Sequence, residues 1–414
     1  MSMVIEIVTI GDELLVGHIV NTNASYLGKY LTALGFEVRW MTTVGDDAPL
    51  LKQALATAMS RADIVIMTGG LGPTHDDITK NVAAEFFESG FVYKPEILDR
   101  LKQAFAARGI KMAAVNEVQA QVPEKATIID NPVGTAPGLL FETAGKQCII
   151  LPGVPHEMKA MCETTVFPML KGKGQTVLQK TIRTTGIAES SLFERLGDIQ
   201  RLEEFAKVAF LPKSAGVDVR LTVRGTNPAE CEGRLSKALQ VVRDRAGEFI
   251  YAYDGGDLEE VVAQLFFEKK KTVAVAESCS GGMLANRLTN ISGSSAYFER
   301  GVVAYSNRAK IEILGVPVEV IEKFGAVSDE CAVAMAEGIR KVSDADFGIS
   351  TTGIAGPTGG TAEKPVGLVY IGFAKTGESY SKRMMFINDR ITNKERAVQA
   401  ALNLLRKELN LISM

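Results

Sequence analysis

The chain has 414 residues, of which 46% are hydrophobic and 23% charged, and its formal net charge is -3. This length exceeds one ordinary hydrophobic core, so we expect two or three domains. The slightly acidic balance argues against a polyanion-binding surface, and no apolar run reaches membrane-spanning length, so neither nucleic acid nor a membrane is an expected partner.

Two residue types restrict the chemistry. Five scattered cysteines form no CxxC pair, which fits free thiols in a reducing cytoplasm. The first residues lack the features of a signal peptide, so we expect a cytoplasmic protein. The three histidines are His18, His75 and His156, and none follows. The C-terminal half therefore cannot build a Ser-His-Asp, Cys-His or histidine-bearing zinc site from its own residues.

The N-terminal part alternates strand and helix patterns. Strands are expected over 4–10, 36–43, 64–68 and 147–151, and helices over 21–34, 48–60 and 78–88. This order predicts an α/β domain with a mostly parallel, doubly wound sheet that binds ligands at the carboxyl ends of its strands.

The pattern of expected strands and helices changes twice in the rest of the chain. A small α+β module is expected next, with strands over 176–185 and 217–224 and a helix over 228–246. A second α/β domain follows. Its expected strands are 272–276, 301–305, 347–352, 366–374 and 380–387, and its expected helices are 258–271, 281–289, 329–341 and 392–409.

A glycine-rich loop, TGGLGPTHDD, follows the third strand over residues 68–77. Gly69, Gly70 and Gly72 permit a backbone that closely approaches a ligand, and the amides of such loops face anions. The spacing matches neither GxxxxGK[ST] nor GxGxxG. The loop therefore predicts a phosphate site without a common nucleotide motif.

Carboxylates stand beside this loop. Asp76 and Asp77 precede the next helix, and one of them is expected to be its N-cap. The other would repel a phosphate unless a divalent cation lay between them, which predicts a metal-assisted site. Glu13, after the first strand, is a further acidic candidate or a solvated loop residue.

The segments IGDELL (10–15), TGGLGPTHDD (68–77) and LPGVPHEM (151–158) resemble the CinA family (competence/damage-inducible protein). Its N-terminal domain is similar to molybdopterin-binding domains. The resemblance implies ADP-ribose pyrophosphatase activity, giving AMP and ribose 5-phosphate, with Mg, Mn or Co as cofactor. The alternative is a non-catalytic molybdopterin- or nucleotide-binding regulatory module. The implied metal ligands are Asp76, Asp77 and Glu13, and the implied substrate contacts are Gly69, Gly70, Gly72 and Thr74.

A second candidate site begins in AVAESCSGG (274–282), which places Ser278 at a strand-to-helix turn. Amides at the start of that helix could form an oxyanion hole, although Ser278 could instead cap the helix. Cys279 is either a competing nucleophile or a small buried filler. Because histidine is absent, the base must be a lysine of lowered pKa or a tyrosine, and Tyr305 and Lys310 are candidates.

A second glycine-rich loop, TTGIAGPTGG, spans residues 351–360 and could hold a phosphate. Thr352 and Gly353 lie at the tip of the preceding strand, and Gly356 lies within the loop. Arg390, before the last helix, is a possible phosphate ligand or a surface partner of Asp389.

The segments 276–282, 293–300, 305–310, 325–328, 353–357 and 363–367 resemble nicotinamide mononucleotide deamidases, the C-terminal domain of full-length CinA proteins. The resemblance implies hydrolysis of nicotinamide mononucleotide to nicotinate mononucleotide and ammonia without a cofactor. It makes Ser278 the nucleophile and Tyr305 with Lys310 its activating pair. Further implied substrate contacts are Thr352 at the amide, Arg390 at the phosphate, and Gly281, Gly353 and Gly356.

The middle module resembles the KH-type domain of the same family, but GIAE stands at 186–189 where GxxG is sought. We interpret it as a spacer and dimerisation element. The expected domains are therefore 1–171, 172–253 and 254–414. Together they predict a homodimeric, bifunctional hydrolase of pyridine-nucleotide salvage whose partners are small nucleotides.

Overall fold

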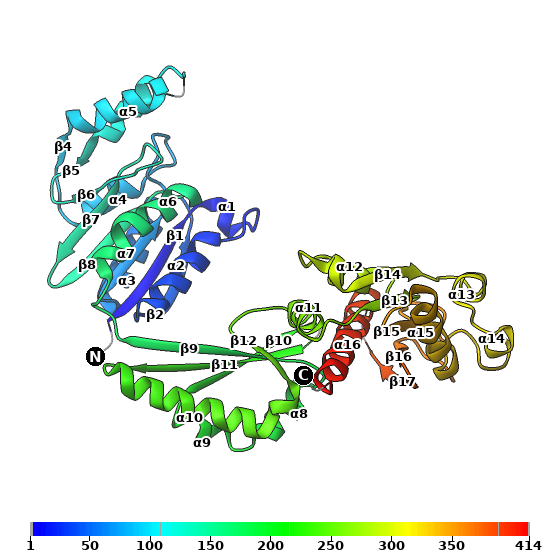
Figure 1. The fold of residues 1–414 in the computed structure, drawn as a ribbon. Helices are drawn as coiled ribbons and strands as arrows, with labels where there is room; N and C mark the ends of the chain where they lie inside the picture. Colours follow the sequence, from blue (N-terminus) through cyan, green and yellow to red (C-terminus); the bar gives the residue numbers. More distant parts are fainter. Residues whose placement is uncertain (1–2, 108, 215, 388, 413–414) are drawn as a thin grey trace. The chain divides into compact units, whose positions relative to one another are not determined.

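The structure is a computed structural model that describes residues 3–107, 109–214, 216–387 and 389–412 (Figure 1). The chain forms two compact units. The first comprises Met1–Leu178 with Arg224–Glu232, and the second comprises Gln179–Val223 with Gly233–Met414. Most of the KH-type module thus shares a unit with the C-terminal domain. The chain passes between the units at residues 178–179, 223–224 and 232–233.

The first unit contains a six-stranded sheet of order β2-β1-β3-β8-β7-β6. The first four strands run parallel, and β7 and β6 are antiparallel to their neighbours. The strands of this unit are β1 Val4–Ile10, β2 Glu37–Val44, β3 Ile64–Thr68, β4 Phe91–Tyr93, β5 Gln121–Pro123, β6 Thr127–Ile129, β7 Gly138–Thr143 and β8 Lys146–Leu151. The strands β4 and β5 form a separate pair.

Helices cover both faces of this sheet because alternate strand residues point to opposite sides. Ile5 and Ile7 pack with α2 and α6, while Val8 and Ile10 pack with α3 and α4. The helices are α1 Asp12–Leu15, α2 Thr22–Ala33, α3 Ala48–Arg61, α4 Thr79–Phe86, α5 Pro95–Ala107, α6 Pro155–Met161 and α7 Phe167–Leu170, with a 3-10 helix at Ala114–Ala120 and a π-helix at Cys162–Val166. The expected doubly wound α/β class is confirmed.

The KH-type module has an antiparallel sheet of order β10-β11-β9-β12 with helices packed beside it. Ile182, Val219 and Leu221 are fully buried in it. Its elements are β9 Thr176–Thr184, α8 Glu189–Leu196, α9 Ile199–Glu203, β10 Lys207–Lys213, β11 Gly216–Gly225, α10 Pro228–Ala246 and β12 Ile250–Tyr253, with a 3-10 turn at Gly247–Phe249.

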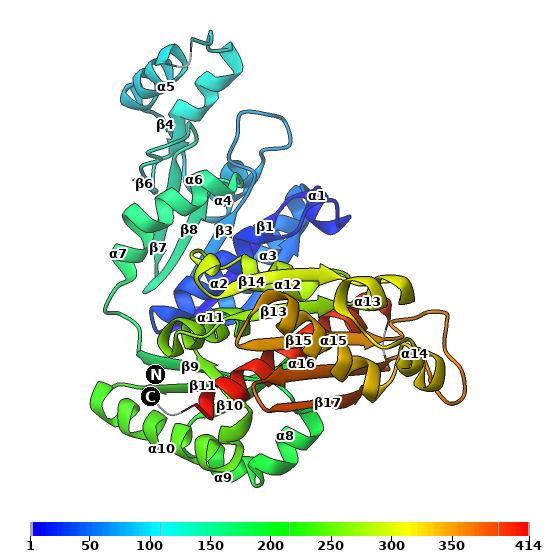
Figure 2. The ribbon, with the colours of Figure 1, turned by 45° about the vertical axis from the view of Figure 1, so that its right-hand side comes forward.

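The C-terminal domain has a five-stranded sheet of order β14-β13-β15-β16-β17 (Figure 2). Its strands are β13 Val273–Glu277, β14 Phe298–Val303, β15 Phe347–Gly353, β16 Leu368–Lys375 and β17 Glu378–Met385. Its helices are α11 Leu258–Lys269, α12 Met283–Thr289, α13 Asn307–Leu314, α14 Val318–Phe324, α15 Asp329–Ser343 and α16 Arg390–Asn410, with a 3-10 turn at Ser294–Ala296. One sheet face packs on α11 and α16, and the other packs on α15.

The three parallel strands β14, β13 and β15 end at the same edge of this sheet, since Glu277 pairs with both Val303 and Thr351. The chain following these three ends supplies the residues of the second candidate site. Helix α16 runs on from this domain to the KH-type module, where Gln399 Nε2 donates to Thr185 Oγ1 at 3.2 Å. Among the described residues, no helix is long and apolar enough to cross a membrane.

Candidate functional site

Ser278 and Lys310 meet at the edge where the parallel strands of the C-terminal domain end. The Nζ atom of Lys310, on α13, lies 3.1 Å from Ser278 Oγ. It also lies 2.9 Å from the carbonyl oxygen of Ala304 and 3.4 Å from that of Tyr305. Lys310 is only 1% exposed, and burial lowers its pKa from the ordinary value of 10.5. A neutral amine that donates to the two carbonyls keeps its lone pair for the Ser278 proton.

The turn that carries Ser278 is fixed by the neighbouring strand. The Ser278 amide donates to the carbonyl oxygen of Thr351 at 2.9 Å, and the Gly281 amide donates to that of Ser278 at 3.2 Å. Helix α12 begins only at Met283, because Gly281 and Gly282 hold left-handed φ angles of 62° and 93°. Ser278 therefore does not cap this helix, and the helix expected from residue 281 starts two residues later.

Glu277, the last residue of β13, is fully buried beside this turn. Its carboxylate accepts hydrogen bonds from one hydroxyl and three backbone amides, those of Ser280 (2.6 Å), Gly282 (3.1 Å), Leu284 (3.0 Å) and Ala285 (2.8 Å). The amides of Gly282, Leu284 and Ala285 are thus engaged by Glu277 and cannot also bind an oxyanion. Within the described part of the chain, the amides of Cys279 and Ser280 make no backbone hydrogen bond.

Cys279 follows the candidate nucleophile but is poorly suited to attack. It is 7% exposed, and burial raises the pKa of its thiol to about 12. The thiolate is the nucleophilic form of cysteine, so almost none of it is present near neutral pH. The structure favours the small buried filler over the competing nucleophile.

Tyr305 and Arg390 lie together beside the second glycine-rich loop. One guanidinium nitrogen of Arg390 donates to the Gly356 carbonyl oxygen at 2.7 Å, and another lies 3.2 Å from Tyr305 Oη. Tyr305 is 61% exposed, and it contacts Lys310 through its backbone carbonyl. Asp389 instead caps α16 by accepting from the amide of Ile391 at 2.9 Å.

Thr352 and Gly353, at the end of β15, are both held by neighbouring backbone. The Thr352 hydroxyl donates to the Ala326 carbonyl oxygen at 2.6 Å, so it can offer a ligand only lone pairs. A Cβ on Gly353 would lie 2.6 Å from the Leu368 carbonyl oxygen, so this glycine serves the close pairing of β15 with β16.

Lys394 lies one helical turn beyond Arg390 and was not predicted. It is half-buried, and its amine lies 3.5 Å from the position that a Cβ on Gly281 would occupy. The signal was the spacing of Arg390 and Lys394, because residues four apart share a helix face. Lys394 thus lies beside the Ser278 turn, whereas Arg390 contacts the second glycine-rich loop.

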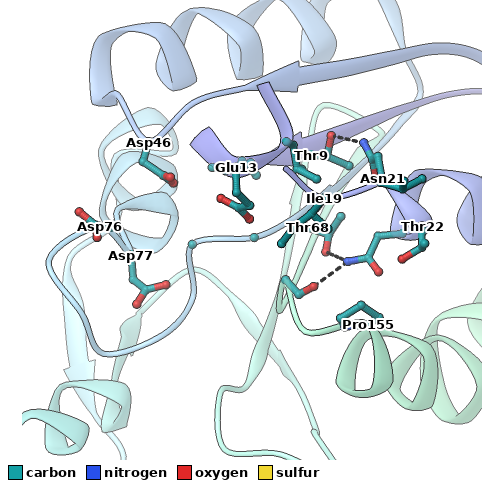
Figure 3. A pocket seen from close by; sticks show the side chains of 18 residues that line it. Thr9, Glu13, Ile19, Asn21, Thr22, Asp46, Thr68, Asp76, Asp77 and Pro155 are labelled. Atoms are coloured by element: carbon teal, nitrogen blue, oxygen red, sulfur yellow. Dashed lines mark hydrogen bonds between the residues drawn. The ribbon is translucent and has the colours of Figure 1, made fainter. Parts of the chain in front are cut away.

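The first candidate site is a cavity of about 330 Å³ at the carboxyl ends of β1 and β3. Gly69, Gly70, Glu13, Asp76 and Asp77 line it as expected, whereas Gly72 and Thr74 do not. In Figure 3 the acidic side chains gather at one end of the pocket and hydroxyl and amide groups at the other. The missed residues that line it include Asp46, Asn21, Asn23 and Thr68.

The paired aspartates of the first loop do not cap the next helix. The N-cap position of α4 is Ile78, which makes no side-chain capping bond. Asp77 instead accepts from the Thr74 amide at 2.8 Å and from its hydroxyl at 2.5 Å, which closes the loop on itself. The exposed Asp76 lies 2.8 Å from His75 Nε2. The expected aspartate cap is therefore wrong: helix α4 starts at Thr79, two residues after Asp77, and the Asp77 side chain bonds within the loop instead.

The acidic end of the pocket concentrates negative charge. Burial raises the pKa of Asp46, and the nearby carboxylates of Asp12, Glu13 and Asp76 raise it further. No three histidine, cysteine or acidic side chains among the described residues form a ready metal site. The oxygen-only donors still fit a hard cation such as Mg²⁺, which commonly takes one or two carboxylates together with substrate phosphates.

Three family models match successive parts of the chain. A probable molybdopterin binding domain matches residues 6–172, a damage-inducible protein CinA KH domain matches 179–252, and a CinA C-terminal domain matches 256–409. With the two α/β sheets and the KH-type sheet, these matches define a multidomain α/β protein with a molybdopterin-binding-like domain.

Relatives of the same length narrow this class. A putative competence-damage inducible protein of Caldicellulosiruptor saccharolyticus is 45% identical over 408 residues, covering 98% of this chain and 99% of that protein. A CinA-like protein of Chloroherpeton thalassium is 44% identical over 418 residues, covering 99% and 100%. A crystal structure of the protein CinA with unknown function from Thermoplasma acidophilum is 36% identical, covers 41% of this chain and 98% of that chain, and has a TM-score of 0.38. The chain belongs to the CinA family.

Proposed function

We propose that the C-terminal domain hydrolyses nicotinamide mononucleotide to nicotinate mononucleotide and ammonia. One observation carries this proposal: the amine of a buried lysine lies 3.1 Å from the hydroxyl of Ser278. A serine hydroxyl is a weak nucleophile until a base takes its proton, and a desolvated lysine can be that base. With no histidine after residue 156, Lys310 is the base that the domain offers.

The first half-reaction forms an acyl-enzyme. Lys310 takes the hydroxyl proton as Ser278 Oγ bonds to the carboxamide carbon, and the carbonyl oxygen becomes an oxyanion. The amides of Cys279 and Ser280 directly follow the nucleophile and make no bond to a described backbone carbonyl, and we assign the oxyanion to them. The C–N bond then breaks, and Lys310 returns the proton to the departing nitrogen, which leaves as ammonia.

The second half-reaction releases the acid. Lys310 takes a proton from water, the water oxygen bonds to the acyl carbon, and the ester bond to Ser278 breaks with return of the proton to Oγ. Thr352 suits the carboxamide, because its lone pairs can accept a hydrogen bond from the –NH₂ group. Arg390 and Lys394 suit the substrate phosphate as charged donors on adjacent turns of α16.

The test is ammonia release from nicotinamide mononucleotide by the full chain and by two matched variants. Ser278→Ala should abolish ammonia release, whereas Cys279→Ala should keep most of it, because the buried thiol stays protonated. Free nicotinamide, which lacks the ribose phosphate, should be a much poorer substrate. An inactive wild-type chain, or activity that survives in Ser278→Ala and is lost in Cys279→Ala, would refute the proposal.

We infer a second activity for the N-terminal domain, the hydrolysis of ADP-ribose to AMP and ribose 5-phosphate. The supporting observation is the cavity in which Gly69 and Gly70 face four lining carboxylates, those of Glu13, Asp46, Asp76 and Asp77. These carboxylates would repel a pyrophosphate, so the site calls for a bound cation. A divalent ion held by Asp46, Asp76 or Glu13 would neutralise phosphate charge and lower the pKa of a bound water.

The residues of the loop itself would shape the phosphate site in this reaction. Gly69 and Gly70 let the loop backbone approach the phosphates, and Asp77 keeps the loop closed through Thr74. AMP release from ADP-ribose, with and without EDTA, tests the activity. ADP-ribose that binds without being cleaved would favour the alternative, a nucleotide-binding regulatory module.

A further inference from the structure

We propose that Glu277 is a positioning residue of the deamidation reaction, holding the Ser278 turn in its reactive geometry through an acceptor-only carboxylate. The proposal rests on the proposed function of the C-terminal domain. Glu277 would contact neither substrate nor the transferred proton. It acts on Ser278 through the backbone that the two residues share.

The bonds of Glu277 span the whole turn. Its Oε2 atom accepts from the Ser280 hydroxyl and from the amides of Gly282 and Leu284, and its Oε1 atom accepts from the Ala285 amide. No described residue forms an ion pair with this carboxylate. The carboxylate is therefore stabilised by hydrogen-bond donors of the turn itself. Because it is buried, the loss or displacement of one donor would leave part of its charge unpaired and destabilise the fold.

A second set of bonds links the same turn to β15. Ser280 Oγ lies 2.6 Å from Thr351 Oγ1, and the Ser278 amide donates to the Thr351 carbonyl oxygen at 2.9 Å. Because the Ser280 hydroxyl donates its one proton to Glu277, Thr351 must be the donor to Ser280. Glu277, Ser280 and Thr351 thus form a buried chain that holds both sides of Ser278.

The donor count explains why this position calls for a carboxylate. A glutamine amide has one acceptor oxygen, and its –NH₂ group would face an N–H donor. With its oxygen at the Oε2 position, glutamine could keep three of the four bonds, but its –NH₂ would oppose the Ala285 amide. Glu277→Gln therefore shifts the start of α12 against the Ser278 turn while it conserves volume.

The expected effect lies in kcat. A reacting group displaced by about 1 Å can cost roughly 10²-fold in rate, so we expect Glu277→Gln to lower kcat between about tenfold and 10²-fold. The KM for nicotinamide mononucleotide should stay within about threefold, because no substrate contact is removed. The pH–rate profile should keep its acid limb, because Lys310 is still the base in this variant.

The experiment measures kcat, KM, the pH–rate profile and Tm for the full chain and three variants. Ser280→Ala removes one donor to Glu277 and tests the same chain if Glu277→Gln does not fold; its kcat should also fall. Asp346→Asn is the matched control. Asp346 likewise accepts backbone and hydroxyl bonds from Thr272, and in addition pairs with Lys271, but at the opposite end of β13. This variant should therefore lose stability and keep kcat.

The outcomes distinguish the proposed deamidase activity from the positioning role of Glu277. A wild-type chain that releases no ammonia overturns the proposed function. With an active wild type, the positioning role is overturned by unchanged kcat in the folded Glu277 and Ser280 variants. It is also overturned by a rise in KM alone, by loss of the acid limb, or by an equal loss of kcat in Asp346→Asn.

Discussion

Replacing Lys310 with methionine is the most direct test of the catalytic geometry. Methionine has a similar length and no charge, so the change removes the amine that lies 3.1 Å from Ser278 Oγ while it fills most of the space. General-base catalysis typically contributes 10²–10⁴-fold, so kcat should fall by about 10²–10⁴-fold. This loss corresponds to about 2.7–5.4 kcal/mol at 1.36 kcal/mol per tenfold change.

Stability should change far less than activity. The substitution leaves the Ala304 carbonyl oxygen without its lysine donor, which costs about 1–3 kcal/mol for a buried group. It also removes a buried amine whose charged form is disfavoured by desolvation, and this gain offsets part of the loss. A folded variant with a Tm within several degrees of wild type would therefore still be nearly inactive.

The pH dependence has a definite sign. The free amine is the active form, so kcat/KM should rise with pH and level off above the pKa of Lys310. Burial lowers that pKa, so the limb should lie below the ordinary lysine value of 10.5. Below the pKa, each unit of pH should cost about tenfold, and the residual activity of Lys310→Met should lack this limb.

The assay follows ammonia release at saturating nicotinamide mononucleotide for kcat, and well below KM for kcat/KM. Lys269→Met is the matched control, because Lys269 also donates to a backbone carbonyl, that of Ile412, but on α11. A Lys310→Ala variant should be partly rescued by added primary amines. An unchanged kcat in Lys310→Met, or an equal loss in Lys269→Met, would remove Lys310 from the mechanism.

Three further results are expected. Arg390→Met should raise the KM for nicotinamide mononucleotide by roughly 10- to 100-fold, the loss of a charge-assisted bond of about 1.5–3 kcal/mol; unchanged binding in calorimetry would contradict it. Asp76→Asn should weaken metal-dependent ADP-ribose hydrolysis and leave deamidation intact, and EDTA should stop only the first reaction; loss of both activities would count against two separate sites. Gly353→Ala should lower stability by about 1–3 kcal/mol in thermal unfolding, because a Cβ there would lie 2.6 Å from a carbonyl oxygen, so an unaltered Tm would be surprising.

Long periodic segments of this chain were predictable. The strands β1 and β3 and the helix α10 have the expected bounds, since buried parallel strands and a 19-residue helix leave clear patterns. The region between α4 and β8 carried no expected element, although it holds four short strands and α5. Strands of three residues, such as β4 and β6, are too short to show a period.

The site was predictable in its residue types but not in its bonds. The absence of histidine led to Lys310, and the structure places it against Ser278. The role of Glu277 was not visible, because its donors depend on where α12 begins, and two glycines delay that start. The expectation that Asp76 or Asp77 caps α4 is also wrong, because Ile78 holds the N-cap position and Asp77 accepts from Thr74, earlier in the loop. The position of a helix end decides which backbone amides lack an intrahelical partner, and sequence patterns locate helix ends poorly.

The segment Arg224–Glu232 has a practical consequence for cutting the chain. It belongs to the first unit, where an Arg224 guanidinium nitrogen donates to the Phe36 carbonyl oxygen at 3.1 Å, yet both of its flanks belong to the second. A single proteolytic nick near residue 178 would therefore cut residues 1–178 from a segment that belongs to the same unit. An expression fragment ending at residue 172, where the family match stops, would lack part of its own unit and would expose the surface that this segment covers.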